Sequence, residues 1–200
     1  MIQDIGWQVW KQVCRFIRDN PEMKLSISVN LSAQQFNNPR EWRQMEDFMN
    51  LCQVPPERVK LEIAERVNMQ DEQYMNKAMK ELSDKGFRFC VDDFGIGYSN
   101  LASLMNYPFE IIKLDRSLIV QMPTDPVNRQ SVQCLVDMFH NMGMRIVAEG
   151  VETEEQKDLI RGMGVEHIQG FYYARPMPAR DTLDFLAQAQ RADEDRADLA

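Results

Sequence analysis

Two adjacent carboxylates, Asp92 and Asp93, are the residues of this sequence whose types and spacing point most directly to chemistry. They lie in the stretch FRFCVDDFGIGYS (residues 87–99), which begins with strand-like aromatic and β-branched residues and continues into a loop with two glycines. Adjacent acids at a strand end are costly unless a positive group lies between them, and a divalent cation with oxygen ligands is the usual solution. A solvated turn is the alternative, because Asp and Gly are also common turn residues.

Strand-like and helix-like patterns alternate along the chain. We expect strands at residues 24–30, 59–64, 87–93, 110–114, 144–149 and 166–170. We expect helices at residues 4–19, 39–53, 71–85, 100–105, 127–141, 153–162 and 180–189. This alternation predicts an α/β fold with parallel strands and crossover helices, either an open doubly wound sheet or a (β/α)8 barrel.

Polar side chains fall at or near the C-terminal end of every expected strand, and this distribution favours the barrel. They are Asn30, Glu62, Asp92, Asp93, Lys113, Glu149 and Gln169. In a closed barrel these strand ends converge on one mouth, whereas the outer strands of an open sheet would hold them too far apart to cooperate. We therefore predict a TIM-like barrel with about six βα units present, whose missing strands precede Met1 unless the barrel is incomplete.

Carboxylates, an amide and a lysine around one mouth are suited to a pair of divalent ions, which can clamp the attacking and leaving oxygens of a phosphoryl displacement. Asp92 and Asp93 could bridge the ions or divide between them, and Asn30 and Glu62 would add neutral and charged oxygens. A single acid of this kind is often only a solvated surface group. A set of such residues at the same end of successive strands is hard to obtain by chance.

Two further residues of the set have expected roles beside the ions. Lys113 would offset negative charge and hold a water or a phosphate oxygen, or it could form an ion pair at the barrel rim. Glu149, within the sequence AEGVE, could be a further metal ligand or a general base.

Composition narrows the class of protein. The 200 residues are 44% hydrophobic and 27% charged, which suits one globular domain, placed at residues 1–190, before a polar tail at 191–200 that we expect to be frayed. The net charge of −8 argues against DNA or RNA binding by a basic face. Four separated cysteines predict buried free thiols in a reducing cytoplasm. The chain has neither an apolar run long enough to span a membrane nor a signal peptide pattern.

Six motifs, in order over nearly the whole chain, resemble those of the EAL domain, the cyclic di-GMP phosphodiesterase module of bacterial signalling proteins. They are SVNLSAQQF (28–36), LEIAE (61–65), VDDFGIGYSNLASL (91–104), IKLDRSLI (112–119), IVAEGVETEEQ (146–156) and IQGFYYARPMP (168–178). The resemblance implies a TIM-like barrel, two Mg²⁺ or Mn²⁺ ions, and hydrolysis of cyclic di-GMP to linear pGpG.

The resemblance also implies roles for individual positions. The expected metal ligands are Asn30, Glu62, Asp92, Asp93 and Glu149, and the residues expected to add cofactor contacts are Gln169 and Asp115. Lys113 would contact a metal-bound water, and Glu152 is implied to be a further active-site acid. Glu65 would brace the loop at 93–99, which helps to form the second metal site and lies near the family's dimer contact.

One departure from the family pattern concerns the motif that names it. Glu-Ala-Leu would lie upstream of the helix expected at residues 4–19; its glutamate is a metal ligand and its strand helps to close the barrel. We therefore expect an N-terminally truncated EAL domain, and little or no hydrolysis by these 200 residues alone. Ala64 replaces the family's usual threonine, which is expected to loosen the brace by Glu65.

The expected partners are a second copy of the chain in a homodimer, and an upstream sensor or GGDEF-type domain in the parent protein. Missing barrel strands would leave two open sheet edges that invite pairing. The alternative function is a non-catalytic cyclic di-GMP receptor or protein-interaction module. The retained Glu62, Asp92, Asp93 and Lys113 favour an enzymatic parent.

Overall fold

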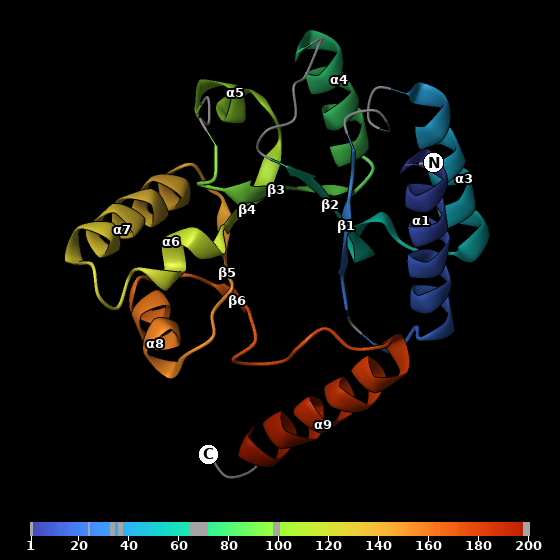
Figure 1. Cartoon of the computed structure of the whole chain (residues 1–200). Helices are drawn as coiled ribbons and strands as arrows, with labels where there is room; N and C mark the ends of the chain where they lie inside the picture. Colours follow the sequence, from blue (N-terminus) through green and yellow to red (C-terminus); the bar gives the residue numbers. More distant parts are fainter. Residues whose placement is uncertain are drawn as a thin grey trace.

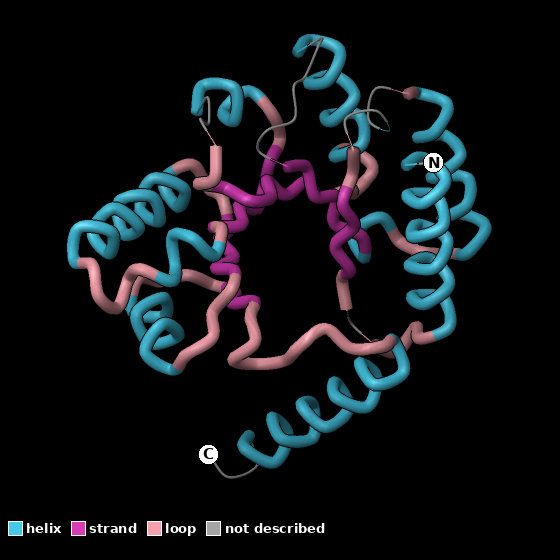
Figure 2. Tube along the Cα trace, viewed as in Figure 1, coloured by secondary structure: helices cyan, strands magenta, loops and turns pink. Residues whose placement is uncertain are grey.

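Six parallel strands form one curved sheet in which each strand pairs with the next along the chain. The computed structural model describes residues 2–23, 25–32, 35, 38–64, 72–97 and 101–197. The strands are β1 (Ile27–Asn30), β2 (Val59–Ala64), β3 (Arg88–Phe94), β4 (Phe109–Leu114), β5 (Arg145–Glu149) and β6 (His167–Gln169). They follow part of a ring with helices outside it, as Figures 1 and 2 show. A doubly wound sheet would reverse its strand order at a switch point. The consecutive order instead confirms an incomplete TIM-like barrel.

The helices alternate with the strands much as the sequence predicts (Figure 1). They are α1 (Ile2–Asp19), α3 (Pro39–Cys52), the 3₁₀ helix η1 (Pro56–Arg58), α4 (Glu72–Ser83), α5 (Leu101–Asn106), α6 (Arg116–Val120), α7 (Pro126–Asn141), α8 (Glu154–Gly162) and α9 (Ala179–Ala197). Neither α6 nor η1 is among the helices expected from the sequence. The expected end of the last helix at residue 189 is wrong, because α9 continues to Ala197 through most of the expected tail.

Local sequence explains where three of these helices begin. The side chain of Asn38 accepts a hydrogen bond from the first turn of α3, and Asp125 accepts two from the first turn of α7. Thr153 caps α8, and Gln156 completes a reciprocal capping box with it. Each cap satisfies backbone N–H groups that have no partner within the helix.

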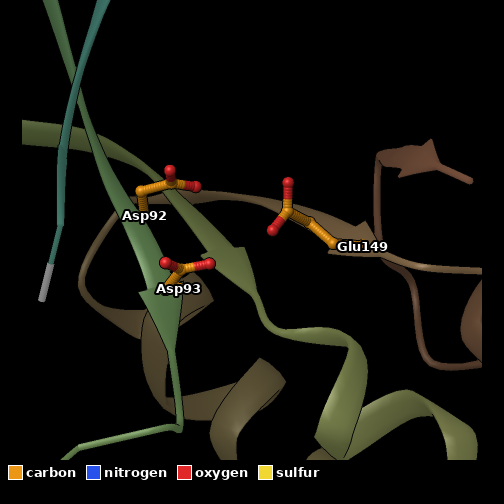
Figure 3. A group of neighbouring side chains, drawn as sticks. All are labelled: Asp92, Asp93 and Glu149. Atoms are coloured by element: carbon orange, nitrogen blue, oxygen red, sulfur yellow. The ribbon is translucent and has the colours of Figure 1, made fainter. Parts of the chain in front are cut away.

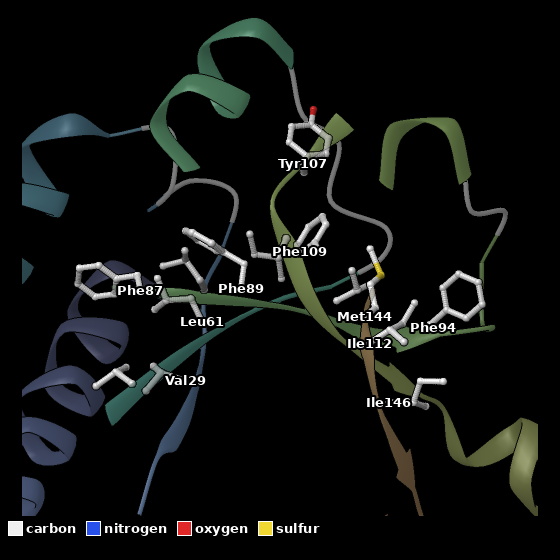
Figure 4. Packing of buried hydrophobic residues seen from close by; sticks show 14 of the residues in the cluster. Val29, Leu61, Phe87, Phe89, Phe94, Tyr107, Phe109, Ile112, Met144 and Ile146 are labelled. Atoms are coloured by element: carbon white, nitrogen blue, oxygen red, sulfur yellow. The ribbon is translucent and has the colours of Figure 1, made fainter. Parts of the chain in front are cut away.

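The hydrophobic core lies between the sheet and the surrounding helices (Figure 4). Successive side chains of a strand point to opposite faces. Leu61, Phe89, Ile112 and Ile146 therefore pack in the core, and their neighbours along the strands point into the ring. Those neighbours include polar residues that line an inner cavity of about 200 Å³. One face of the sheet thus holds the fold together and leaves the other available for polar chemistry.

The four cysteines are free thiols, and the prediction that all are buried is wrong for one of them. Cys14, Cys52 and Cys90 are buried, whereas Cys134 is exposed on α7. Burial raises the pKa of Cys14 and of Cys90 to about 12, so these thiols stay protonated at neutral pH. Among the described residues, no helix is long and apolar enough to cross a membrane.

At the start of β6, the side chain of Glu166 accepts a backbone hydrogen bond from the neighbouring strand β5. Glu166 precedes β6, and its Oε2 accepts a hydrogen bond of 3.0 Å from the N–H of Ile146 on β5. Its Oε1 lies 3.2 Å from Nε2 of His140 at the end of α7. Burial raises the pKa of Glu166, but the hydrogen bonds from Ile146 and His140 outweigh this and hold the pKa below its usual range.

We predict that Glu166→Gln lowers stability only where the carboxylate is charged. Because the pKa is lowered by folding, the stabilisation is present above the usual value of 4.5 and is lost as the pH falls through the lower folded value. The variant should melt about 2–4 °C below the parent at pH 7, and this difference should vanish at low pH. Thermal melts across the pH range measure it, with the exposed Glu81→Gln as control. A pH-independent difference would contradict this account.

Candidate functional site

The two adjacent acids of β3 point to the same side of the sheet, although neighbouring residues of a regular strand point to opposite sides. Asp93 has a left-handed backbone with φ of 56°, and the pairing of β3 with β4 shifts register between Val91 and Phe94. This irregularity turns Asp93 toward the side that Asp92 already faces, and both carboxylates point toward Glu149 (Figure 3). The sequence predicted that Asp92 and Asp93 act together, but not the left-handed backbone and register shift that turn both to the same side.

A buried lysine lies at the centre of the site. Nζ of Lys113 is 2.9 Å from Glu62, 2.7 Å from Asp92 and 2.8 Å from Glu149, and the lysine side chain is only 9% exposed. Four consecutive strands, β2 to β5, therefore contribute to one cluster, as the strand-end pattern predicts. The lysine compensates the charge of carboxylates that would otherwise repel one another in a site of low dielectric.

The protonation of Lys113 and of Glu149 follows from this contact. Burial would lower the pKa of Lys113, but its hydrogen bonds to Asp92, Glu149 and Glu62 raise the pKa above its usual value. Burial raises the pKa of Glu149, and the Lys113 ammonium opposes this only in part. Lys113 is therefore a permanent cation, whereas Glu149 takes up a proton more readily than an exposed glutamate.

The carboxylates fit a divalent cation. One oxygen each of Asp92, Asp93 and Glu149 lies within 4.8 Å of the others, a spacing that one ion between them could span. With Glu62, the four carboxylates exceed the charge of Lys113 by three, so added positive charge would be favourable. The donor set consists of hard oxygen ligands, which suit a hard divalent cation.

Asn30 and Gln169 extend the polar rim at its two ends. Asn30 pairs in register with Glu62, and Gln169 pairs in register with Glu149. Both are exposed at the C-terminal ends of β1 and β6. The structure thus brings these two predicted residues next to the acidic cluster, and the role of Asn30 as a metal ligand and that of Gln169 as a cofactor contact stay predictions.

A cleft of about 510 Å³ adjoins the acidic cluster at Glu149. It is lined by Arg116, Glu149, Gly150, Glu152, Gln169, Gly170, Phe171, Ala174, Arg175 and Pro176. Glu152, a predicted site residue, forms an ion pair of 3.0 Å with Arg116. The guanidinium of Arg175 stacks over the ring of Phe171 at 4.5 Å from its centroid. Two arginines and an aromatic ring beside an acidic cluster provide contacts for phosphate groups and for a nucleobase.

Arg116 and Phe171 were given no role from the sequence. Arg116 directly follows the predicted site residue Asp115, and Phe171 lies two residues after Gln169. Their place in the loops that follow β4 and β6 was the available signal, because such loops carry the ligand contacts of barrel proteins.

One predicted residue makes its contact outside the cluster. Asp115 caps α6 by accepting a hydrogen bond of 2.8 Å from the N–H of Ser117, which orients the helix that carries Arg116. This contact gives Asp115 a structural task, and its expected contact with a cofactor stays a prediction. Glu65 lies outside the described residues, as does the end of the loop that it was expected to brace.

The model of the EAL domain matches residues 1–176. The chain belongs to the EAL domain family. This EAL domain is 33% identical over 190 residues, 94% of the chain, to the bifunctional diguanylate cyclase/cyclic di-GMP phosphodiesterase MucR of Pseudomonas aeruginosa. It covers only 28% of the length of MucR and 24% of that of the Bacillus subtilis signaling protein YkoW.

Solved structures support the same assignment. The EAL domain is similar to the PaMucR phosphodiesterase in complex with c-di-GMP, with a TM-score of 0.83 and 33% identity over 90% of this chain and 74% of that one. It is also similar to Klebsiella pneumoniae BlrP1 in a manganese and cyclic di-GMP complex, with a TM-score of 0.79 and 25% identity over 87% of this chain and 45% of that one.

We predict that Lys113→Met destabilises this EAL domain far more than loss of an exposed lysine. The variant would leave three clustered carboxylates without their cation, which should cost about 3–5 kcal/mol of unfolding free energy at pH 7 without divalent ions. The loss should shrink as the pH falls and the carboxylates become protonated. Denaturant unfolding in a chelating buffer measures both effects.

Lys85→Met is the matched control, because Lys85 also contacts a carboxylate, Glu46 at 2.6 Å, but is half exposed. Its removal should cost about 0–1 kcal/mol. Equal losses in the two variants would show that the Lys113 cluster does not hold the strands together.

Proposed function

We propose that this EAL domain carries the site of a metal-dependent phosphodiesterase that hydrolyses cyclic di-GMP to linear pGpG. The observation that carries the proposal is that Glu149 belongs at once to the acidic cluster with Asp92 and Asp93 and to the lining of the cleft. A ligand in that cleft would therefore place a phosphate next to the cluster. The named activity of MucR and its complex with c-di-GMP agree with this.

The residues present would hold Mg²⁺ or Mn²⁺ through Asp92, Asp93, Glu149, Glu62 and Asn30. Bound divalent ions would neutralise charge on the phosphodiester and favour attack by water. BlrP1, in complex with manganese and cyclic di-GMP, supports the choice of a divalent ion.

The side chains around the ions would stabilise charge, accept a proton and orient the substrate. Lys113 stays protonated, so it would stabilise negative charge rather than accept a proton. The raised pKa of Glu149 suits a role as general base, and its place in the acidic cluster would alternatively allow its carboxylate to serve as a ligand. Arg116 and Arg175 would orient the phosphates, and Phe171 would stack against a base.

The wider setting is also part of the proposal. We place the activity in bacterial second-messenger signalling, in the cytoplasm, with an upstream sensor or GGDEF-type domain in the parent protein and a homodimer as the working assembly. MucR, whose name includes a diguanylate cyclase, is a precedent for a multi-activity parent. For the 200 residues alone we expect weak turnover, because β1 and β6 are not joined by further strands among the described residues.

The decisive experiment measures binding and cleavage of cyclic di-GMP by the chain with and without Mn²⁺. Calorimetry should show nucleotide binding that requires the ion, and chromatography should show slow formation of pGpG. Asp93→Asn should reduce both by about 100-fold or more, since even groups that only orient metal ligands are worth about 10- to 100-fold. Asparagine tolerates the left-handed backbone of Asp93, so this variant should keep the fold.

Asp137→Asn on the exposed face of α7 is the control and should match the parent. The absence of metal-dependent binding and of cleavage would refute the proposal. Tight binding without any turnover would instead favour the receptor function.

A further inference from the structure

One wall of the cleft is a segment without regular secondary structure, residues 170–176. Gly170, Phe171, Ala174, Arg175 and Pro176 all contribute to the lining. Because the segment follows the last strand of the sheet, strand pairing cannot fix it, and its position must come from other contacts.

Backbone contacts attach the start of this segment to the connection between β5 and α8. The N–H of Tyr172 donates to the carbonyl of Val151 at 3.0 Å, and the N–H of Val151 donates to the carbonyl of Gln169 at 3.2 Å. A Cβ at Gly170 would lie 2.0 Å from the Val151 carbonyl oxygen, so only glycine permits this approach. The start of the segment therefore lies close against Val151, and Tyr172 is the last described residue of the segment to form a backbone hydrogen bond with that connection.

A lysine from α8 makes the next contact. Nζ of Lys157 lies 3.3 Å from the hydroxyl of Tyr172 and 5.1 Å from its ring centroid. The same ammonium lies 3.1 Å from Glu154 and 3.2 Å from Asp158, and the lysine side chain is only 14% exposed. Two carboxylates on the same helix thus hold the ammonium in place while it donates to the tyrosine.

Gln156, the residue before Lys157 on α8, contacts the backbone of Glu152, which lines another part of the cleft. Oε1 of the buried Gln156 accepts hydrogen bonds from the N–H groups of Glu152 and Thr153 at 2.8 and 3.1 Å. Glu152 in turn pairs with Arg116 across the lining. One turn of a single helix therefore contacts both walls of the cleft.

From this geometry we infer that Lys157 is a positioning residue, which acts through Tyr172 to hold Phe171 and Arg175 in the wall of the cleft. As a contribution to ligand binding, the inference rests on the proposed function. Stability of α8 is a poor alternative explanation, because ion pairs within a helix contribute little when their carboxylates are as exposed as those of Glu154 and Asp158. The contact that distinguishes Lys157 is the one it makes with a residue outside its helix.

The inference predicts a selective effect on affinity. Lys157→Met keeps the length of the side chain but loses the donor, and should weaken binding of cyclic di-GMP about three- to tenfold, the range for one hydrogen bond. KM should rise by a similar factor while kcat stays within about twofold, because the acidic cluster is untouched. Lys157→Arg should restore affinity. Tyr172→Phe should show part of the loss, since it keeps the ring.

A second readout does not require any ligand. Hydrogen exchange at the amide of Tyr172 should be about two- to tenfold faster in Lys157→Met than in the parent, while amides of α8 and β5 exchange as before. Lys77→Met on α4 is the control, because Lys77 also faces a helical carboxylate, that of Glu81, while α4 lies away from α8 around the ring (Figure 1) and contributes no residue to the lining of the cleft.

The two readouts separate the possible failures. Unchanged exchange at Tyr172 in Lys157→Met would overturn the inference whatever the ligand. Faster exchange at Tyr172 in a chain whose parent form neither binds nor cleaves cyclic di-GMP would support the positioning of the wall and refute the proposed function. Faster exchange with unchanged affinity and KM would refute the effect on binding.

Discussion

The inside of this fold depends on one buried cation. Lys113 on β4 contacts carboxylates from β2, β3 and β5, so a single ammonium group connects four strands on the face of the sheet that lines the inner cavity. Clustered carboxylates in such a place would protonate or separate if no cation lay among them. Because the lysine is part of the chain, the acids are held close together before any ligand arrives. A preformed cluster of this kind requires little rearrangement when a divalent ion binds.

The alignment of these acids requires an unfavourable backbone conformation at Asp93, at the end of β3. A left-handed conformation at a residue other than glycine is unfavourable by about 1–2 kcal/mol, and aspartate is among the residues that tolerate it best. As a result, Asp93 joins Asp92 on one side of the sheet, and a carboxylate oxygen of Asp93 lies within 4.8 Å of one of Glu149. A regular strand would have directed Asp93 toward the core side. The irregularity is therefore what converts two neighbours in sequence into two neighbours in space.

Sequence periodicity predicted the strands, their parallel order and the convergence of polar strand ends, because burial imposes those patterns directly. The contact of Lys113 with Glu62 and Glu149 follows from that convergence. The alignment of Asp93 could not be predicted in the same way, since it depends on a register shift between two strands. The exposure of Cys134 and the extension of α9 to Ala197 were also missed. The exposure of Cys134 depends on which face of α7 packs inward, and the polar end of α9 carries little hydrophobic signal in the sequence.

The acidic cluster and the cleft wall are built from different parts of the fold, and Glu149 joins them. The acids lie near the ends of strands whose other face packs in the core, and Lys113 holds three of them together. Beyond Glu149 the chain turns at Gly150, with φ of 66°, where a Cβ would lie 2.3 Å from the side chain of Arg116. This glycine lets the arginine reach the cleft while the chain continues to Glu152 and α8. Changes in the loops and in α8 can therefore alter how a ligand is held without moving the acids, whereas any change at the Lys113 cluster affects the fold and the site together.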